Sequence, residues 1–326
     1  MLRISGLRLV ALFSALVLVS PSYGLAAEAY PSRLVKVIVA FPPGSTLDAL
    51  TRIVAEQMAK KWGQSVLVEN ISGGGGNIGT DRFVRSDPDG YTLLSSPPGP
   101  LTVNPLLYGD AAPDPTKFTP VSLVATTPNV FVVKNALGVG SVQEFLAKAK
   151  AQPGKITYAS QGVGSTPFLT AKLLENRTGI QLTHVPYRGS APALTDIVAG
   201  HVDMMFDTIG TSAPLHRAGS AKILAVASVQ RFALMPEIPT MAEAGVPDFR
   251  SGSFFGMMAP PNTPSAIADK ISGDVHEIMQ RPEVGARLRQ LMLEPVGSTP
   301  ADTLKFLAGE TALWGQIIKI TGATLR

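Results

Sequence analysis

Short apolar runs alternate with amphipathic stretches along most of this chain, and this alternation restricts the folds that it can adopt. The first unit places a buried-strand run at 35–41 before a helical stripe that ends near Gly63. Strands that are separated by single helices are typical of βαβ units, in which consecutive strands run parallel. The chain is therefore expected to form an α/β fold with mainly parallel sheets.

The same patterns continue towards the C-terminus. Strands are expected at 65–69, 91–95, 156–159, 182–185, 202–206 and 223–227, with extended segments at 121–126 and 130–133. Helices are expected at 79–85, 142–150, 166–176, 191–199, 265–279, 283–291 and 301–318. The 326 residues are too many for one small core and indicate one large domain or two ordinary ones.

The order of strand, loop and helix occurs twice with the same loop sequence. One copy surrounds Gly44-Ser45-Thr46, and the other, over 155–177, surrounds Gly164-Ser165-Thr166. The tripeptide alone is a weak match, but the shared frame predicts two similar lobes, each with its own sheet. The extended segments at 121–126 and 251–257 are the candidates for crossovers between these lobes.

These loops have a chemical capacity of their own. A loop that enters a helix leaves backbone N–H groups free, and the helix dipole adds partial positive charge there. Such a terminus holds a carboxylate or phosphate without a cationic side chain, and in open α/β sheets it lies where ligands bind. The alternative is simple N-capping, by Ser45 with Asp48 as a capping box and by Ser165 or Thr166. The two interpretations are compatible.

Composition and missing motifs exclude several classes of protein. The chain has no cysteine, which excludes disulfides, thiolate metal sites, iron–sulfur clusters and a cysteine nucleophile. The net charge of +4, without a basic run, argues against a nucleic-acid groove. The four histidines form no H-E-x-x-H motif or close metal pair, and neither a G-x-S-x-G elbow nor a Walker A loop occurs. We therefore expect no catalytic residues, metal or cofactor.

Three further features allow more than one interpretation. The glycines at 74, 76 and 79 match a dinucleotide fingerprint, but no acidic residue follows at about 20 residues, so a turn that lines a cleft is favoured. Asp207 ends a strand, and it either reaches a cleft or caps the following helix. Arg188 follows another strand, and it either pairs with an anion or faces solvent.

The first residues have the pattern of a signal peptide. Arg3 and Arg8 precede an apolar run at 9–19, and Ala27-Glu28-Ala29 matches a cleavage site. The alternative is an uncleaved N-terminal anchor, which is disfavoured because the apolar run is shorter than the ~20 residues of a membrane span. No cysteine follows it, so a lipid anchor is excluded. The mature chain is expected to be soluble and exported to a bacterial periplasm.

A series of short motifs follows in a fixed order. They are Tyr30-Pro31-Ser32-Arg33, Phe41-Pro42-Pro43-Gly44 with Asp48, Val68-Glu69-Asn70, Gly75-Gly76-Asn77-Ile78-Gly79, Pro88-Asp89-Gly90-Tyr91-Thr92-Leu93-Leu94, Asn104-Pro105 with Leu107-Tyr108, His184-Val185-Pro186-Tyr187-Arg188-Gly189, Ala193-Leu194-Thr195-Asp196, Pro239-Thr240-Met241-Ala242-Glu243-Ala244-Gly245 and Glu294-Pro295-Val296-Gly297. Each motif is weak alone, but their joint order is specific. The chain resembles the extracytoplasmic receptors of tripartite tricarboxylate transporters, also called the Bug family.

The resemblance implies a type II periplasmic binding protein, an α/β fold in which two lobes, joined by crossing strands, enclose a ligand cleft. It implies a signal peptide at 1–29, a discontinuous lobe 1 at 30–124 plus 251–326, and lobe 2 at 125–250. In such relatives, one loop from each lobe pinches a ligand carboxylate. The ligand-binding residues that this implies here are Phe41, Gly44, Ser45, Thr46, Ser96, Gly164, Ser165, Thr166 and Asp207.

This chain departs from the family pattern in three places. Ser45 replaces a common glycine of the first loop, the loop at 95–100 is richer in proline than usual, and Phe254 stands where relatives often have tryptophan. These departures leave the implied fold and class unchanged but bear on the identity of the ligand.

The expected function is that of a periplasmic receptor, a monomer and not an enzyme. It would capture a small organic acid and deliver it to the membrane permease of a tripartite tricarboxylate transporter. Three alternatives stay open. The chain could be an exported hydrolase with an unrecognised Ser/His site, a nicotinamide-dependent oxidoreductase that uses residues 74–79, or a sensor that contacts a signalling partner.

Overall fold

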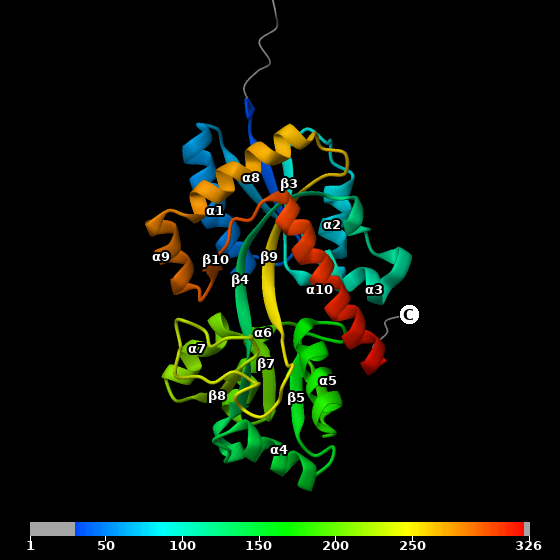
Figure 1. The fold of residues 1–326 in the computed structure, drawn as a ribbon, viewed down its shortest axis with the longest axis vertical. Helices are drawn as coiled ribbons and strands as arrows, with labels where there is room; N and C mark the ends of the chain where they lie inside the picture. Colours follow the sequence, from blue (N-terminus) through cyan, green and yellow to red (C-terminus); the bar gives the residue numbers. More distant parts are fainter. Residues whose placement is uncertain (1–29, 323–326) are drawn as a thin grey trace, which may run out of the picture.

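Two α/β halves are stacked along the long axis of the molecule (Figure 1). The computed structural model describes residues 30–322. The predicted signal peptide, 1–29, lies outside the described residues. Within 30–322, no helix is both long enough and apolar enough to cross a membrane.

Each half contains strands with helices packed around them (Figure 1). The upper half contains β1 (Val35–Val39), α1 (Thr46–Trp62), β2 (Val66–Asn70), α2 (Asn77–Val84), β3 (Thr92–Ser96), α3 (Asn104–Tyr108), α8 (Ser265–Met279), α9 (Pro282–Gln290) and β10 (Glu294–Pro295). The lower half contains α4 (Val142–Ala151), β5 (Thr157–Ser160), α5 (Thr166–Thr178), β6 (Thr183–Pro186), α6 (Ser190–Ala199), β7 (Met204–Thr208), α7 (Ile209–Arg217) and β8 (Ala221–Val226). The elements that connect the halves are β4 (Thr119–Lys134), β9 (Gly252–Ala259) and α10 (Pro300–Thr321).

The strands β4 and β9 cross between the halves. β4 pairs antiparallel with β9 as far as Pro128, which is opposite Gly252, and from Asn129 onward it pairs with β7 and β8. The hydrogen-bonded order is β2-β1-β3-β9-β4-β7-β5-β6, and β8 and β10 also pair with β4. The segments at 121–126 and 251–257 belong to this crossing, so the prediction of two lobes joined by crossing strands is confirmed.

Two expectations about the sheets are wrong. The halves do not have separate sheets, because β4 pairs with strands of both and the strands form one continuous path. The sheet is also not mainly parallel. The pairs β1–β2, β1–β3, β5–β6 and β5–β7 are parallel, whereas the described pairs that involve β4 or β9 are antiparallel. The cause is that the chain crosses along β4 and returns along β9 in the opposite direction.

The two Gly-Ser-Thr loops take up matching local structures. Ser45 is the N-cap of α1 and Ser165 is the N-cap of α5, and both have extended backbone angles. Both helices end at a glycine in the left-handed region, Gly63 with φ 64° and Gly179 with φ 70°, which favours glycine. The internal repeat that the sequence predicts is therefore present as two equivalent strand–loop–helix units.

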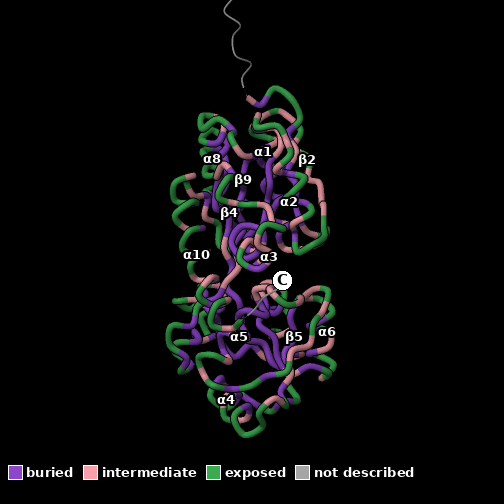
Figure 2. The backbone as a smooth tube through the Cα atoms, turned by 90° about the vertical axis from the view of Figure 1, so that its right-hand side faces the viewer, coloured by how far each residue is buried: buried purple, intermediate pink, exposed green. Residues whose placement is uncertain are grey.

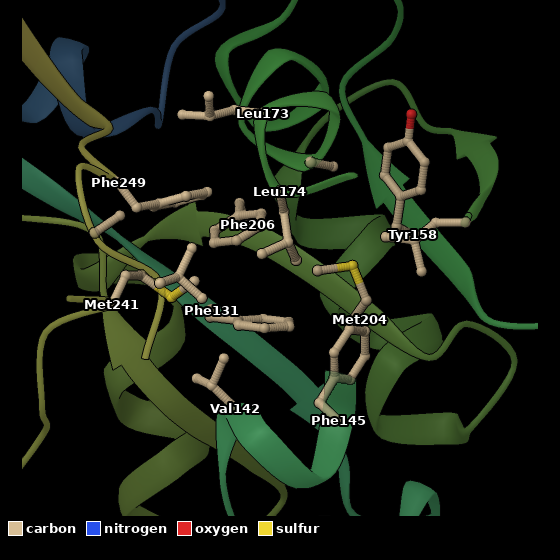
Figure 3. Close-up of a cluster of buried hydrophobic side chains, with 14 of the residues drawn as sticks. Phe131, Val142, Phe145, Tyr158, Leu173, Leu174, Met204, Phe206, Met241 and Phe249 are labelled. Atoms are coloured by element: carbon tan, nitrogen blue, oxygen red, sulfur yellow. The ribbon is translucent and has the colours of Figure 1, made fainter. Parts of the chain in front are cut away.

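Each half has its own apolar core, seen as the buried interior of Figure 2. The lower core is rich in aromatic rings. The ring of Phe131 on β4 lies 4.8 Å from that of Phe145 and 4.9 Å from that of Phe206, between centroids (Figure 3). Since β4 supplies Phe131 to this core and Val121 to the upper core, the crossing strand is anchored at both ends.

Helix α10 is a third connection between the halves. Near its start, the Thr303 hydroxyl accepts a hydrogen bond from the backbone N–H of Leu123 on β4, at 3.0 Å. Further along, Trp314 has no exposed surface and packs in the lower core, where α10 runs against α5. Trp314 is therefore a packing residue that joins α10 to the lower core.

Truncation of Phe131 tests the lower core. We expect Phe131→Ala to reduce the free energy of unfolding by about 3–5 kcal/mol, because it removes a buried ring and leaves a cavity. Phe131→Leu, which keeps most of the apolar volume, should cost clearly less. Urea unfolding followed by circular dichroism measures both. Equal losses for the two variants would contradict the assigned packing.

Candidate functional site

A cavity of about 920 Å³ lies between the two halves. It is bounded by the loops that follow β1, β3, β5, β6 and β7 and by the crossing strands. The lining residues include Phe41, Pro42, Pro43, Gly44, Ser45, Thr46, Ser72, Gly73, Gly75, Gly76, Pro97, Pro98, Gly99, Asn104, Tyr108, Asn129, Gln161, Gly164, Ser165, Thr166, Arg188, Ser190, Asp207, Thr211, Ser253 and Phe255. Most of these groups are neutral, so the cavity offers a ligand mainly dipoles and hydrogen-bonding groups.

The start of α1 forms part of the upper wall. The Ser45 hydroxyl accepts the N–H of Asp48 at 3.2 Å, and the Asp48 carboxylate accepts the N–H of Gly44 at 2.9 Å. No hydrogen bond among residues 30–322 uses the backbone N–H of Ser45, Thr46 or Leu47. This terminus therefore offers free donors to the cavity, at the positive end of a 17-residue helix.

The Asp48 carboxylate fixes the shape of the same loop. Its side chain is buried, and it also accepts hydrogen bonds from Asn70 at 3.0 Å and from Arg52, whose guanidinium lies 3.0 Å away. Burial opposes ionisation, but the hydrogen bonds from Arg52, Gly44 and Asn70 and the charge of Arg52 outweigh it, so the pKa of Asp48 is lowered. The carboxylate is thus held charged and holds the loop that enters α1.

The start of α5 forms the opposing part of the lower wall. The Ser165 hydroxyl donates to the carbonyl of Gly162 at 2.7 Å and accepts the N–H of Phe168 at 3.4 Å. The Ser165 N–H also donates to Gly162, at 3.2 Å. Within the described part of the chain, the N–H groups of Gly164 and Thr166 have no protein acceptor. The free donors of this loop are therefore those of Gly164 and Thr166, and capping and ligand binding use different groups.

A chain of hydrogen bonds links α5 to the crossing strands. The Asn129 amide donates to Ser251 at 2.7 Å, the hydroxyls of Ser251 and Thr170 are 2.6 Å apart, and Thr170 donates to the carbonyl of Thr166 at 2.6 Å. Asn129, Ser251 and Thr170 are all buried. The first turn of α5 is thus fixed directly to the point where β4 changes partners.

Asp207 lies at the end of β7 with no exposed surface. Its carboxyl accepts hydrogen bonds from the hydroxyls of Ser190 at 2.7 Å, Ser212 at 2.8 Å and Thr211 at 2.5 Å. Burial raises the pKa of Asp207, and the hydrogen bonds oppose that rise. Asp207 therefore borders the cavity and holds hydroxyls at the starts of α6 and α7. The N-cap of α7 is Thr208, so the interpretation of Asp207 as the cap of the following helix is wrong.

Of the nine residues named as ligand-binding from the sequence, eight line this cavity. The exception is Ser96. It ends β3 opposite Gly256 of β9, has no exposed surface, and its hydroxyl donates to the carbonyl of Pro97 at 3.2 Å. The pairing of β3 with β9 buries Ser96, and the next residues, Pro97 to Gly99, line the cavity instead.

The sequence interpretation missed several lining residues. Tyr108 and Asn104 come from α3, and Asn129, Ser253 and Phe255 come from the crossing strands. Their positions at the cavity depend on packing between segments that are distant in sequence, and no local sequence pattern predicts it. Asn104-Pro105 and Leu107-Tyr108 did occur among the family motifs, and that was the signal that pointed to α3.

The four-glycine turn lies in the cavity wall. Its residues Gly73 to Gly76 all have positive φ, from 56° to 129°, which only glycine adopts readily. A Cβ atom at Gly79 would lie 2.5 Å from the carbonyl oxygen of Ile71 and 2.9 Å from Cα of Ala40. The glycines therefore serve a tight turn and a close helix–strand approach, as expected for a turn that lines a cleft.

The histidine nearest to a serine lies outside this cavity. His184 Nε2 is 2.7 Å from the Ser160 hydroxyl, and its ring packs against Tyr158 and Phe168, each with a centroid distance of 4.9 Å. Burial, together with the charge of Lys172, lowers the pKa of His184. No group of three potential metal-ligating side chains occurs among the described residues.

Comparisons with known proteins agree on one family. Residues 50–323 match the family model described as the tripartite tricarboxylate transporter family receptor. The chain is 35% identical over 307 residues to the protein BugT of Bordetella pertussis, which covers 93% of each chain.

Solved structures of similar proteins include two with bound carboxylates. Rpa4515 of R. palustris, with adipate, has a TM-score of 0.84 and 35% identity, and the match covers 90% of this chain and 99% of that one. MatC of Rhodopseudomonas palustris, with bound malate, has a TM-score of 0.79 and 30% identity, and the match covers 89% of this chain and 100% of that one.

The role of Asp48 predicts a dependence of stability on pH. Its pKa is lower in the folded than in the unfolded chain, so the carboxylate stabilises the fold above the ordinary aspartate pKa of about 3.9, and this contribution is lost as the pH falls through the lowered value. We expect Asp48→Asn to lower the free energy of unfolding by about 1–2 kcal/mol at pH 7. This difference from wild type should shrink below pH 4.

Urea unfolding at pH 7, 5 and 3 measures this effect. Asp302→Asn is the matched control, because Asp302 is an exposed acidic residue in the first turn of α10. A difference for Asp48→Asn that stays constant across the three pH values would contradict the assigned hydrogen bonds.

Proposed function

Since the chain belongs to the tripartite tricarboxylate transporter receptor family, we propose that it captures a small organic acid outside the cytoplasmic membrane and delivers it to a membrane permease. The observation that carries this proposal is the pair of helix starts that border one cavity. α1 presents the free N–H groups of Ser45 and Thr46, and α5 presents those of Gly164 and Thr166. Donors of this kind suit a carboxylate.

A carboxylate between these loops would be held without a direct cation. Each helix contributes a partial positive charge at its start, and the effect is strongest where water is excluded. Phe41 and the prolines that follow it supply apolar surface beside the donors. The ligand would therefore be a small acid with an apolar or mixed body, in agreement with the adipate and malate of the two similar structures.

We propose that the halves correspond to lobes that close over this ligand. Lobe 1 comprises 30–124 plus 251–326, and lobe 2 comprises 125–250. In support, both boundaries fall at the crossing, within β4 and just before β9. Movement at a few residues of these strands would bring the two loops together and exclude water from the ligand.

The proposed ligand-binding residues of the two loops and Asp207 divide into three roles. Thr46, Gly164 and Thr166 would donate backbone N–H groups to the ligand, and Ser45 adds both an N–H and the cap that stabilises its helix. Gly44 and Ser165 shape the loops, since Gly44 has φ 81° and Ser165 is fixed to Gly162. Asp207 would act indirectly, by orienting the hydroxyls of Ser190 and Thr211.

The signal-peptide pattern supports a periplasmic location. Residues 1–29 would direct export and be removed after Ala29. The permease partner follows from the family alone, and we propose that the liganded, closed form is the one that the permease recognises.

Binding of carboxylates should stabilise the mature chain. We expect at least one acid from a panel of mono-, di-, tri- and aromatic carboxylates to raise the Tm in a thermal-shift assay. A ligand at about 100 times its Kd stabilises by about 2.7 kcal/mol, which corresponds to roughly 5–10 °C for a chain of this size. The protein is first unfolded, dialysed and refolded to remove bound ligand. No shift with any acid would contradict the proposed function.

The backbone N–H of Thr166 provides a sharper test. Thr166 is the first residue of α5, where proline is well tolerated, and the extended Ser165 before it suits a following proline. We expect Thr166→Pro, which removes the N–H and the hydroxyl, to weaken binding about 10- to 100-fold, as measured by isothermal titration calorimetry.

Thr166→Val is the matched control, because it removes the hydroxyl but keeps the N–H and the shape of the side chain. It should bind the acid more tightly than Thr166→Pro. Ser165 is less suitable for this test, because its own N–H already donates to Gly162. Equal affinity of the two Thr166 variants would argue against a backbone N–H contact at this position.

A further inference from the structure

The charged side chains that border the cavity are few. Among the described residues of its lining, Arg188 carries the only positive charge, and Asp207 is the only acidic residue. The carboxyl of Asp207 is fully buried and accepts hydrogen bonds from three hydroxyl groups. Within residues 30–322, Arg188 forms no ion pair with Asp207 or with any other acidic side chain, and it lies in the lining of the cavity.

The backbone of Arg188 is held in place although its side chain is exposed. The preceding residue, Tyr187, donates its N–H to the carbonyl of Ser160 at 2.8 Å and its hydroxyl to Asp196 at 2.6 Å. Arg188 itself makes no side-chain hydrogen bond in the described chain. A long cationic side chain on a fixed backbone, at the wall of a cavity, is arranged to meet an anion that arrives with a ligand.

Arg188 also lies close to the proposed carboxylate loop. It follows β6, and the Gly164-Ser165-Thr166 loop follows β5, its parallel neighbour in the sheet. Neighbouring strands are about 4.7–4.9 Å apart, and the two loops leave the same edge of the sheet. A linear ligand with one end at the start of α5 can therefore place its other end beside the guanidinium.

We propose that Arg188 binds the second carboxylate of a dicarboxylic acid and so makes the receptor select dicarboxylates over monocarboxylates. This inference rests on the proposed function, because it assigns the far end of a ligand whose first carboxylate lies at the helix starts. The first end is recognised by neutral N–H groups and does not distinguish one acid from another. The second end is recognised by a planar cation, which pairs with a carboxylate through two parallel hydrogen bonds.

The test compares acids of equal carbon number that differ only in the second carboxylate. The pairs are adipate with hexanoate and succinate with butyrate, and affinities are measured by isothermal titration calorimetry on the mature chain. We expect Arg188→Gln to bind the preferred dicarboxylate about 10- to 100-fold more weakly and to leave monocarboxylate affinity unchanged. Arg188→Lys should recover only part of the loss, since lysine keeps the charge but not the paired geometry.

Arg217→Gln is the matched control for charge. Arg217 is exposed in the last turn of α7, outside the cavity lining, so its loss changes the net charge equally without touching the ligand. This variant should keep both affinities. Circular dichroism and thermal melting should show that all variants fold as the wild type does.

The outcomes separate this inference from the proposed function. If wild type binds monocarboxylates as tightly as dicarboxylates, or if Arg188→Gln weakens both equally or neither, the inference is wrong and the receptor function stands. An equal loss for both acids would mean that Arg188 acts on lobe closure instead. If wild type binds no carboxylate at all, both the proposed function and the inference fall.

Discussion

The change of partner along β4 is the constraint on which the cavity depends. One continuous strand pairs with β9 up to Pro128 and with β7 and β8 from Asn129 onward. Because a strand cannot shift its register by one residue without turning its side chains to the other face, this pairing fixes both halves relative to the crossing. The buried link from Asn129 through Ser251 to Thr170 then ties the crossing to the first turn of α5. The position of the Gly164-Ser165-Thr166 loop is thus set by the crossing strands as well as by the packing of the lower half.

The electrostatics of the cavity depend on the helix N-termini at its wall. Some of these N-termini already have a carboxyl group of the protein beside them, and others do not. Asp207 accepts hydrogen bonds from the hydroxyls of Ser190, Thr211 and Ser212, so the starts of α6 and α7 already have a carboxyl group of the protein beside them. α5 has no such group in its first turn. In α1 the charge of Asp48 is compensated by Arg52. The starts of α1 and α5 consequently remain able to attract an anion.

Local chemistry explains which parts of the fold could be predicted from the sequence. α1, α5 and α8 have clear caps or apolar stripes, and their predicted bounds lie within two residues of the structure. β4 was expected as two extended segments, 121–126 and 130–133, and Pro128 lies in the gap between them. The strand tolerates that proline since the pairing with β9 ends there. The helix after Asp207, α7, was given no bounds from the sequence, because Gly210 and Pro214 disfavour a helix, and tertiary packing outweighs them. The backbone carbonyl of Leu291 approaches Gly210 so closely that a Cβ atom would lie 2.7 Å from it.

The cavity residues likewise fall into two groups, those that local sequence predicts and those that distant contacts place. Those on the two Gly-Ser-Thr loops were predictable, because a small-residue loop between a strand and a helix has a known place at the sheet edge. Ser96 was misplaced relative to the cavity, because its environment is set by β9, a strand about 160 residues away in sequence. Asn129 and Tyr108 depend on equally distant contacts. The positions of Ser96, Asn129 and Tyr108 are therefore set by contacts between distant segments, which the local sequence pattern does not predict.

Helix α10 limits how the halves can move. It is fixed to β4 through Thr303 and to the lower core through Trp314, and Arg250, just before β9, forms an ion pair with Glu310 at 2.8 Å between those two points. A helix held at both ends must bend or slide when two lobes close. Gly309 lies between the anchors, and a Cβ atom there would meet nothing within 4 Å, so packing does not require glycine. Since glycine weakens a helix interior by about 1 kcal/mol relative to alanine, bending of α10 near Gly309 costs less than bending at an alanine. The proposed closure of the lobes would therefore deform the crossing strands and this helix together.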